Sequence, residues 1–349
     1  MKEIKILTAI CLFMISTISA ATLTDSIPAG EILTNIVPDS IDSTKTTVDS
    51  ITKKRTFFRR FADYFVNANK PHPNKKFDFS IIGGPQYSST TSLGIGLVAA
   101  GVYRMDQHDT ITQPSVMSVY GNVSITGFYL LGVRGTNIFP GDKYRLLYNL
   151  YFFSFPSNFW GWGYHDGANK DNKSTYLRLQ NQVKFDFLFR LSHNLYLGPM
   201  VSFDYVSGRD FSKPELLHGQ EKTTLTTGIG ASISYDTRDL ITNAYKGIYV
   251  KFEQGIYPSF MGNKYAFYMT DVIVDWYKKI WKGGVIAIDF HSKFNYGDVP
   301  WTMMSRLGGV ARMRGYYEGQ YRDNNITELQ VELRQHIWRR NGIAVWAGA

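Results

Sequence analysis

The chain has 349 residues and a formal net charge of +9. Its 19% of charged residues is below the roughly 25% of an ordinary soluble domain, while aromatic residues reach 15%. A hydrophobic content of 44% excludes a disordered chain. Beyond the N-terminal segment no stretch is apolar over the roughly 20 residues that a membrane-spanning helix needs. What remains is a soluble β-rich protein or a transmembrane β-barrel.

The N-terminus has the layout of a secretory signal peptide. A short basic start precedes an apolar run from Ile6 to Ile18, and small residues follow. This order predicts a signal peptide over residues 1–20, cleaved after about Ala20; a buried first strand is the alternative. Cys11 is the single cysteine, so the mature chain would contain no thiol. Disulfides and thiolate metal sites are thereby excluded.

Two segments of different composition follow the signal peptide. Residues 21–52 are rich in Ser, Thr and Asp without a sustained period, and predict a flexible periplasmic tether. Residues 53–75 predict a basic amphipathic helix and a linker, because aromatic residues recur there at helical spacing. The residues that define this interfacial helix are Phe57, Arg59, Arg60, Phe61 and Phe65.

We expect the amphipathic helix to lie on an anionic membrane surface or to dock on the following domain. An ordinary solvated helix and a nucleic-acid-binding patch are the alternatives. An exported protein rarely meets nucleic acid, so we expect no nucleic-acid partner.

From residue 76 to residue 349 the pattern has a period of two. Residues 184–191, for example, place Phe or Leu at every second position, with Lys184, Asp186 and Arg190 between them. In a soluble β-sandwich the apolar face would look inward, whereas in a membrane barrel it faces lipid and the charged face lines a watery lumen. Strands are predicted at about 77–88, 91–105, 115–126, 127–139, 143–155, 174–191, 194–207, 222–236, 247–257, 264–279, 284–298, 324–338 and from 343 onward.

The connection lengths favour the barrel. The long connections, at about 156–173, 208–221 and 299–323, follow the fifth, seventh and eleventh predicted strands and therefore lie on one side. Many strands reach the roughly 9–11 residues needed to cross a bilayer obliquely. Aromatic residues near strand ends suit interfacial girdles: Phe159, Trp160, Trp276, Tyr277, Trp281, Trp301 and Trp338. We predict an all-β, transmembrane antiparallel β-barrel over residues 76–349, with a secreted β-sandwich or lectin as the alternative.

The C-terminal part of the chain carries a recognisable series of motifs. They are Tyr-Asp-Thr-Arg-Asp at 235–239, Gly-Ile-Tyr-Val at 247–250, Ser-Arg-Leu-Gly-Gly at 305–309, Met-Arg-Gly-Tyr at 313–316 and Leu-Gln-Val-Glu-Leu-Arg at 329–334. In order and spacing they resemble the BamA/TamA-type outer-membrane insertase superfamily, also called bacterial surface antigens. The resemblance spans about Ser234 to Gly348. It implies a 16-stranded barrel whose sixth extracellular loop, after the eleventh strand, folds back into the lumen.

The resemblance also implies roles for individual residues. Arg314, Gly315 and Tyr316 would form a loop–lumen anchor with Glu332, because the Arg314 guanidinium presents a planar fork of donors to a carboxylate. The alternative is that Arg314 and Glu332 are separately solvated lumen charges. Two further sets are implied, a tight loop turn and a periplasmic turn motif: Gly308 and Gly309 for the first, and Asp236, Arg238, Asp239 and Gly247 for the second.

The chain departs from the family pattern in three places. The segment before Lys76 is too short and of the wrong composition for the family's periplasmic POTRA domains, so we expect a member without them. The position that usually offers a second acid to the loop arginine corresponds to Gly348. Finally, Ala349 falls inside the thirteenth predicted strand. Because an unclosed edge is costly in lipid, we expect a fragment, truncated after about 12–13 strands of the complete barrel.

Three functions are weighed. The first is insertion or export of other outer-membrane proteins from the cell outer membrane, with membrane lipid, outer-membrane protein clients or a periplasmic partner as partners. A weakly paired first strand, in which Pro85 cannot donate to the ladder, would offer an edge to an incoming hairpin. An ordinary Gly-Pro kink is the alternative interpretation of Pro85, and the one we favour. The second is a passive pore for small solutes, tuned by inward charges: Lys184, Asp186, Arg190, Asp289 and Lys293.

The third function, a lipid hydrolase, finds little support. It needs Ser and His within reach on one face, but the adjacent His291 and Ser292 face opposite sides of a strand. The sequence contains no Gly-x-Ser-x-Gly elbow, and its seven histidines show no metal spacing. We therefore expect no enzyme activity, no cofactor and no metal.

Overall fold

The computed structural model describes residues 77–349 except 89–91, 107, 110–111, 310 and 339–340. The predicted signal peptide (1–20), tether (21–52) and amphipathic helix with its linker (53–75) lie outside the described residues and stay predictions. The residues assigned to that helix, Phe57, Arg59, Arg60, Phe61 and Phe65, are among them.

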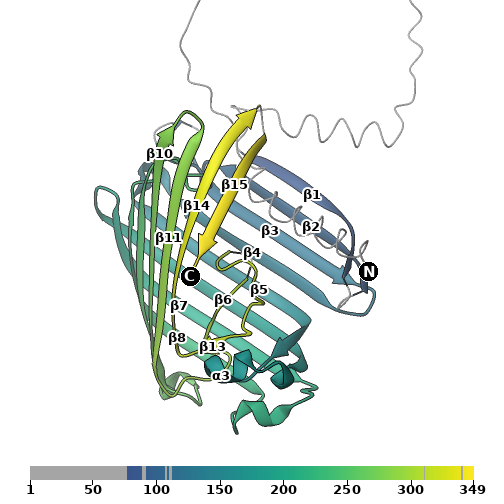
Figure 1. Ribbon diagram of the computed structural model, residues 1–349. Helices are drawn as coiled ribbons and strands as arrows, with labels where there is room; N and C mark the ends of the chain where they lie inside the picture. Colours follow the sequence, from purple (N-terminus) through teal and green to yellow (C-terminus); the bar gives the residue numbers. More distant parts are fainter. Residues whose placement is uncertain (1–76, 89–91, 107, 110–111, 310, 339–340) are drawn as a thin grey trace, which may run out of the picture.

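Thirteen strands form a single antiparallel sheet (Figure 1). They are β1 (Phe77–Ser88), β2 (Ser92–Tyr103), β3 (Ser115–Ser124), β4 (Tyr129–Ile138), β5 (Tyr144–Phe159), β6 (Ser174–Ser192), β7 (Leu195–Arg209), β8 (Thr223–Asp236), β9 (Gly247–Tyr257), β10 (Phe267–Trp281), β11 (Gly284–Gly297), β14 (Asn325–Trp338) and β15 (Asn341–Gly348). Each strand pairs with the next of these in chain order. The predicted strands are confirmed, with shifts of a few residues at their ends.

Short elements occupy the connections. They are η1 (Pro140–Asp142), α3 (Gly163–Ala168), η2 (Lys170–Asn172), η3 (Pro214–Leu217), η4 (Ser259–Met261), β12 (Ser305–Arg306) and β13 (Arg322–Asp323). The long connections after β5, β7 and β11 gather at one end, the lower end in Figure 1, as predicted. We call this the loop end and the opposite end the short-turn end. In the described residues no helix is both long and apolar enough to span a bilayer.

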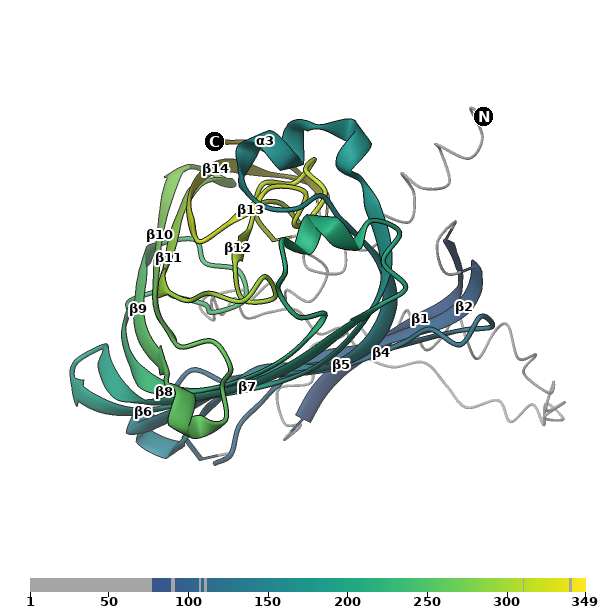
Figure 2. The ribbon, with the colours of Figure 1, turned by 90° about the horizontal axis from the view of Figure 1, so that it is seen from below.

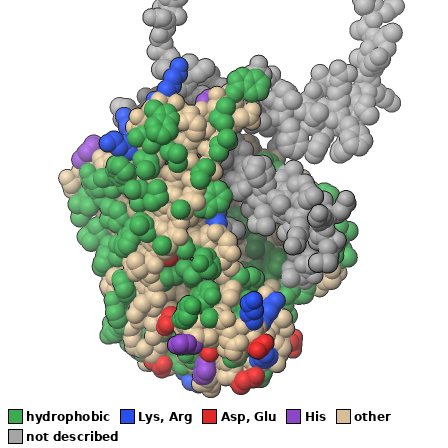
Figure 3. Space-filling model, in the orientation of Figure 1, with side chains coloured by type: hydrophobic (Ala, Val, Ile, Leu, Met, Phe, Trp, Pro, Cys, Tyr) green, Lys and Arg blue, Asp and Glu red, His purple; other side chains and the backbone are tan. Residues whose placement is uncertain are grey.

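The sheet curls around its polar face. On β14, the outward Leu329, Val331 and Leu333 are 37–44% exposed, while the inward Glu328 and Gln330 are 4% and 8% exposed. Figure 3 shows the outward apolar side chains as a broad belt on the wall between two ends that carry the charged groups. A soluble sandwich would bury the first set and expose the second. The apolar residues therefore face outward and the polar residues face inward, as in a membrane barrel.

The lumen near the loop end is filled by apolar side chains. Inward residues of β5, β6 and β7 pack with residues of the long connections, and we call this the aromatic cap: Phe159, Tyr176, Val206, Phe211, Leu216, Leu217 and Trp301. Figure 2 shows these connections gathered inside the curve of the strands. Burial of each large side chain contributes about 1.5–3 kcal/mol, so the cap closes this end as a small hydrophobic core.

The predicted aromatic girdle is right only in part. Trp281 and Trp338 are 52% and 60% exposed on the outside of the short-turn end. Phe159 and Trp301 are 0% and 1% exposed, because they belong to the aromatic cap, and Trp160 is buried as well. Tyr277 is half-buried, and its hydroxyl lies 3.3 Å from the inward Asp275 carboxylate. Trp276 is also only half-exposed.

Because β14 is apolar on its outer face and polar on its inner face, a lysine should cost different amounts of stability at two neighbouring positions. Val331→Lys places a cation in the apolar belt near the middle of the strand, and we expect it to lower the free energy of unfolding by about 2–4 kcal/mol. Gln330→Lys faces the lumen and should cost less than half as much. Urea unfolding of the full chain in phosphatidylcholine vesicles measures both. Equal losses for the two variants would contradict the assignment of faces.

Candidate functional site: a loop folded into the barrel

The connection between β11 and β14 lies within the curve of the strands (Figure 2). Sequence reasoning placed a long loop here but no strands. β12 and β13 pair within it, Ser305 with Asp323 and Arg306 with Arg322. The Arg306 guanidinium also lies 3.1 Å from the Glu318 carboxylate. We call residues 298–324 the inner loop. These contacts give it a defined shape of its own.

Arg322 ties the inner loop to the aromatic cap. Its side chain is buried, its Nη1 donates to the carbonyl oxygen of Trp301 at 2.9 Å, and its guanidinium lies 5.0 Å from the centre of the Phe159 ring. Burial lowers the pKa of the Arg322 guanidinium to about 10, so the group stays charged at neutral pH and interacts with the aromatic faces as a cation. Sequence reasoning missed this residue, since nothing near it in the sequence indicates its partners.

Two arginines join the loop tip to the barrel wall. Arg312 Nε lies 2.6 Å from Asp289 Oδ1 on β11, and Arg314 Nη2 lies 3.8 Å from Glu332 Oε2 on β14. Burial alone would lower the pKa of Arg312, but the Asp289 carboxylate outweighs burial and raises it above its usual value. The shorter contact is thus made by Arg312, which sequence reasoning did not single out. The sequence offered one indication of its role, because Arg312 lies only two residues before Arg314 in the same loop.

Glu332 is shared rather than reserved for the loop. Arg334 Nε lies 2.5 Å from Glu332 Oε1, on the oxygen that Arg314 does not face. Trp346 of β15 is paired with Glu332, and its ring centre lies 4.8 Å from the Arg314 guanidinium. Gly348, where a second acid was sought, has no side chain and pairs with Gln330, so on β15 it is the Trp346 ring that lies near the Arg314 guanidinium. This ring attracts the cation without adding a negative charge.

Glycines shape the loop tip. Gly308, Gly309 and Gly315 have φ angles of 95°, 123° and 114°, which disfavour any residue with a Cβ. A Cβ on Gly308 would also stand 2.7 Å from the Tyr316 carbonyl oxygen, whereas one on Gly315 would meet nothing within 4 Å. The Tyr316 ring is 49% exposed and packs edge-on against Tyr321 at 6.1 Å.

The turn between β8 and β9 contains the second predicted motif. The Asp236 carboxylate accepts from Arg238 Nε at 2.9 Å and from Arg145 Nη1 of β5 at 3.1 Å. Asp239 Oδ1 accepts three backbone N–H groups of the turn, including that of Tyr245 at 2.9 Å. Gly247 has φ 112°, and a Cβ there would stand 2.4 Å from a carbonyl oxygen. The motif residues thus hold the turn and link it to β5.

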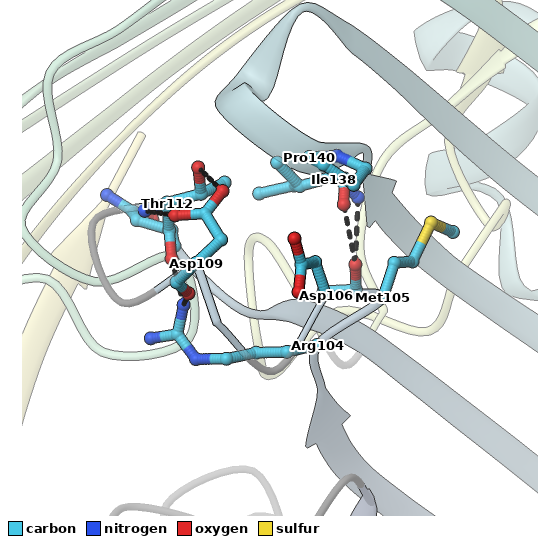
Figure 4. A pocket seen from close by; sticks show the side chains of 9 residues that line it. Arg104, Met105, Asp106, Asp109, Thr112, Ile138 and Pro140 are labelled. Atoms are coloured by element: carbon cyan, nitrogen blue, oxygen red, sulfur yellow. Dashed lines mark hydrogen bonds between the residues drawn. The ribbon is translucent and has the colours of Figure 1, made fainter.

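The β2–β3 connection reaches the same turn. Gln113 Nε2 donates to the Arg238 carbonyl oxygen at 2.7 Å. Figure 4 shows the residues that fold this connection on itself: Arg104 Nη1 donates to the Asp109 carbonyl oxygen at 2.8 Å, and the Asp109 carboxylate accepts the Thr112 N–H at 2.9 Å. The residues line a small pocket between the β2–β3 connection and the start of η1. Because their polar groups bind one another, we assign them a structural role at the short-turn end.

The middle of the lumen contains paired charges. Lys251 Nζ lies 2.6 Å from Asp186 and 3.2 Å from Glu253, and Lys184 lies 2.6 Å from Glu253. These contacts join β6 to β9 across two intervening strands. Arg190 is different from what the sequence indicated: it is exposed at the short-turn end rather than among the lumen pairs. The described residues contain no group of three or more acidic, His or Cys side chains suited to a metal ion.

The loop contacts predict unequal effects of two substitutions. Arg312→Ala removes the 2.6 Å ion pair and should raise the rate of proteolysis within the inner loop about tenfold, as expected for loss of a charge-assisted hydrogen bond. Arg314→Ala removes a 3.8 Å ion pair and a contact with the Trp346 ring, each weaker than a charge-assisted hydrogen bond, and should have a smaller effect. Limited proteolysis of the full chain in vesicles measures both, and Arg209→Ala at the exposed loop end is the control. A larger effect of Arg314→Ala would reverse this ranking.

The turn network predicts a stability loss. Asp236→Asn removes the negative charge between Arg145 and Arg238, which are otherwise left as neighbouring cations, and should lower the free energy of unfolding by about 3 kcal/mol. Asp171→Asn at the exposed loop end should change it by less than about 0.5 kcal/mol. Urea unfolding in vesicles compares them, and similar values would rule out a special role for Asp236.

A model of the Omp85 superfamily domain matches residues 135–346, more than half of the chain. No curated protein matches. One similar solved structure is BamA from Haemophilus ducreyi lacking POTRA domains 1–3, with 13% sequence identity and a TM-score of 0.44. The alignment covers 75% of this chain and 54% of that one, so this chain spans about half its length. The domain match confirms the resemblance drawn from the motifs, and the chain belongs to the Omp85 superfamily.

Proposed function

We propose that this chain is a barrel of the cell outer membrane that assists the insertion or export of other outer-membrane β-proteins. The family supports this role in general. The observation that carries it is the inner loop, which is joined to β11 through Arg312 and Asp289 and to β14 through Arg314 and Glu332. A loop fastened to two neighbouring strands of the wall can hold those strands in one arrangement while a client pairs elsewhere on the sheet.

The edge of β1 is where the proposal places the client. β1 pairs with β2 along its whole length, and no other described strand pairs with it. Pro85 stands near the C-terminal end of β1, opposite Ile95, and has no N–H to donate. A strand edge interrupted in this way pairs weakly, and a client hairpin could add to it by backbone hydrogen bonds.

A passive pore is the second candidate, and the inward charges favour it. Lys184 and Asp186 face the lumen, as do Asp289 and Lys293 of β11, and could select ions by charge. Against it stand the aromatic cap and the inner loop, which fill the lumen at the loop end. The proposed role includes no chemical step, no cofactor and no metal; the partners are membrane lipid and client or periplasmic proteins.

Depletion of the protein followed by quantitative proteomics of the outer membrane tests the assembly role. We expect selective loss of other β-barrel proteins while outer-membrane lipoproteins stay at their usual level. Complementation with the unsubstituted chain should restore the abundance of the other β-barrel proteins. The double variant Arg312→Ala/Arg314→Ala, expressed at equal abundance, should restore it less well. An unchanged barrel profile after depletion would remove the assembly hypothesis.

Planar-bilayer recording separates the pore from the assembly barrel. The natural chain should show little steady current, because the cap and the inner loop obstruct the lumen. The Arg312→Ala/Arg314→Ala variant should show a higher and more variable conductance as the loop loosens. A large, steady, ion-selective current from the natural chain would favour the pore instead.

A further inference from the structure

Exposed basic and aromatic side chains gather where the β10–β11 turn meets the end of β14. We call them the basic–aromatic patch: Lys278, Ile280, Trp281, Lys282 and Trp338. Lys279 is also exposed, but it pairs with the inward Val285 and so lies on the lumen side. The two elements are neighbours, since Gly284 pairs with Gln335. The function proposed above makes no use of this patch.

The patch is shaped by two irregularities of the sheet. The β10–β11 register shifts between Lys279 and Trp281, and the β14–β15 register shifts between His336 and Trp338. A register shift of this kind re-aims the side chain that follows it. The Trp281 indole N–H then donates to Gln335 Oε1 at 2.5 Å, which fixes one ring on the outer surface. Both indoles thus lie beside the lysines at the edge of the apolar belt.

The lysines of the patch have no partner within the described part of the chain. Neither Lys278 nor Lys282 forms an ion pair or a side-chain hydrogen bond there. At the loop end, by contrast, the exposed Lys264 lies 2.5 Å from Glu221. A free cation beside an apolar surface favours an anionic ligand that brings an apolar part of its own.

The two ends of the barrel also differ in charge. The described short turns expose further basic residues but no fully exposed carboxylate: Lys143, Arg190 and Lys246 are exposed, whereas Asp142 and Asp239 are half-buried. Asp142 binds Arg145, and Asp239 binds the backbone of its own turn. The loop end exposes acids as well as bases, among them Asp171, Asp210, Glu215, Glu221 and Asp298. In Figure 3 the coloured atoms at the upper end include Lys and Arg without Asp or Glu, and those at the lower end include both signs.

We propose that the basic–aromatic patch binds the headgroups of anionic phospholipids in the leaflet at the short-turn end of the barrel. This inference rests on the proposed membrane location. Lysine stems extend along apolar surface while their ammonium groups reach the phosphate level, and indoles prefer the same interfacial depth. An acidic protein would need the cations but not the apolar flank, so the exposed Ile280, Trp281 and Trp338 favour a lipid.

Native mass spectrometry of the detergent-solubilised full chain tests the proposal. The chain is mixed with equal amounts of phosphatidylglycerol and phosphatidylcholine, and the ratio of the two lipids retained is measured. We expect phosphatidylglycerol to predominate. Lys278→Gln/Lys282→Gln should lower the ratio at least about fivefold, since a single basic residue near an anionic surface contributes about that factor.

The matched control removes two exposed lysines from the loop end. Lys170→Gln/Lys173→Gln changes the net charge equally and should leave the ratio unchanged. An unchanged ratio in the patch variant, or equal losses in both variants, would overturn the proposal. Displacement of phosphatidylglycerol by soluble polyglutamate would indicate an acidic polypeptide as the ligand and would overturn the lipid assignment.

Insertion is followed separately by protease protection of the barrel in phosphatidylcholine vesicles. Protection of both double variants at the level of the unsubstituted chain shows that they fold. A protected natural chain without preference for phosphatidylglycerol would overturn only the lipid proposal. A natural chain that is never protected would overturn the membrane function and the lipid proposal together.

Discussion

The whole structure depends on the pairing of backbone N–H and C=O groups between adjacent strands. In hydrocarbon an unpaired group costs several kcal/mol, because no water is present to replace the lost hydrogen bond. The continuous ladder from β1 to β15 answers this requirement for the strands between them, while the outer edges of β1 and β15 have no partner among the described strands. It also imposes the period of two, since successive side chains on a paired strand must face opposite sides. The apolar belt and the charged lumen follow from that alternation.

The inner face of the barrel is stabilised in two different ways along its length. In the middle of the lumen, charged side chains are brought together in pairs, as with Lys251 and Asp186, because an isolated charge away from bulk water is costly. Near the loop end the same face carries aromatic residues, and the long connections supply the partners that bury them. Arg322 combines both kinds of contact. It is a buried cation whose neighbours are a carbonyl oxygen and two aromatic rings.

Most of the wall was predictable from the sequence, since strand positions and facing depend on local alternation alone. The motif around Asp236 and Arg238 was found because its residues are close together in the chain. Contacts between residues that the curl of the sheet brings together could not be predicted from the sequence. Nothing local indicates that Arg312 would meet Asp289, or that Lys251 would reach Asp186 across two strands.

Trp301 shows why one of the sequence-based assignments was wrong. An aromatic residue beside a strand end has the same local signature in an interfacial girdle and in a buried cap. The difference is made by the partners, Phe159 and Tyr176, which come from strands far away in the sequence. Trp281 and Trp338 fit the girdle because, within the part of the chain that the structure describes, both stay more than half exposed.

The hydrogen bond from Gln113 to Arg238 has a consequence for the coupling of distant parts of the wall. It joins residues 125 positions apart, and its acceptor belongs to the turn between β8 and β9. The entropic cost of closing a ring of chain rises only with the logarithm of its length, so a ring of this length costs little more than a shorter one. The position of the β2–β3 connection is therefore tied to that of a hairpin in the other half of the chain.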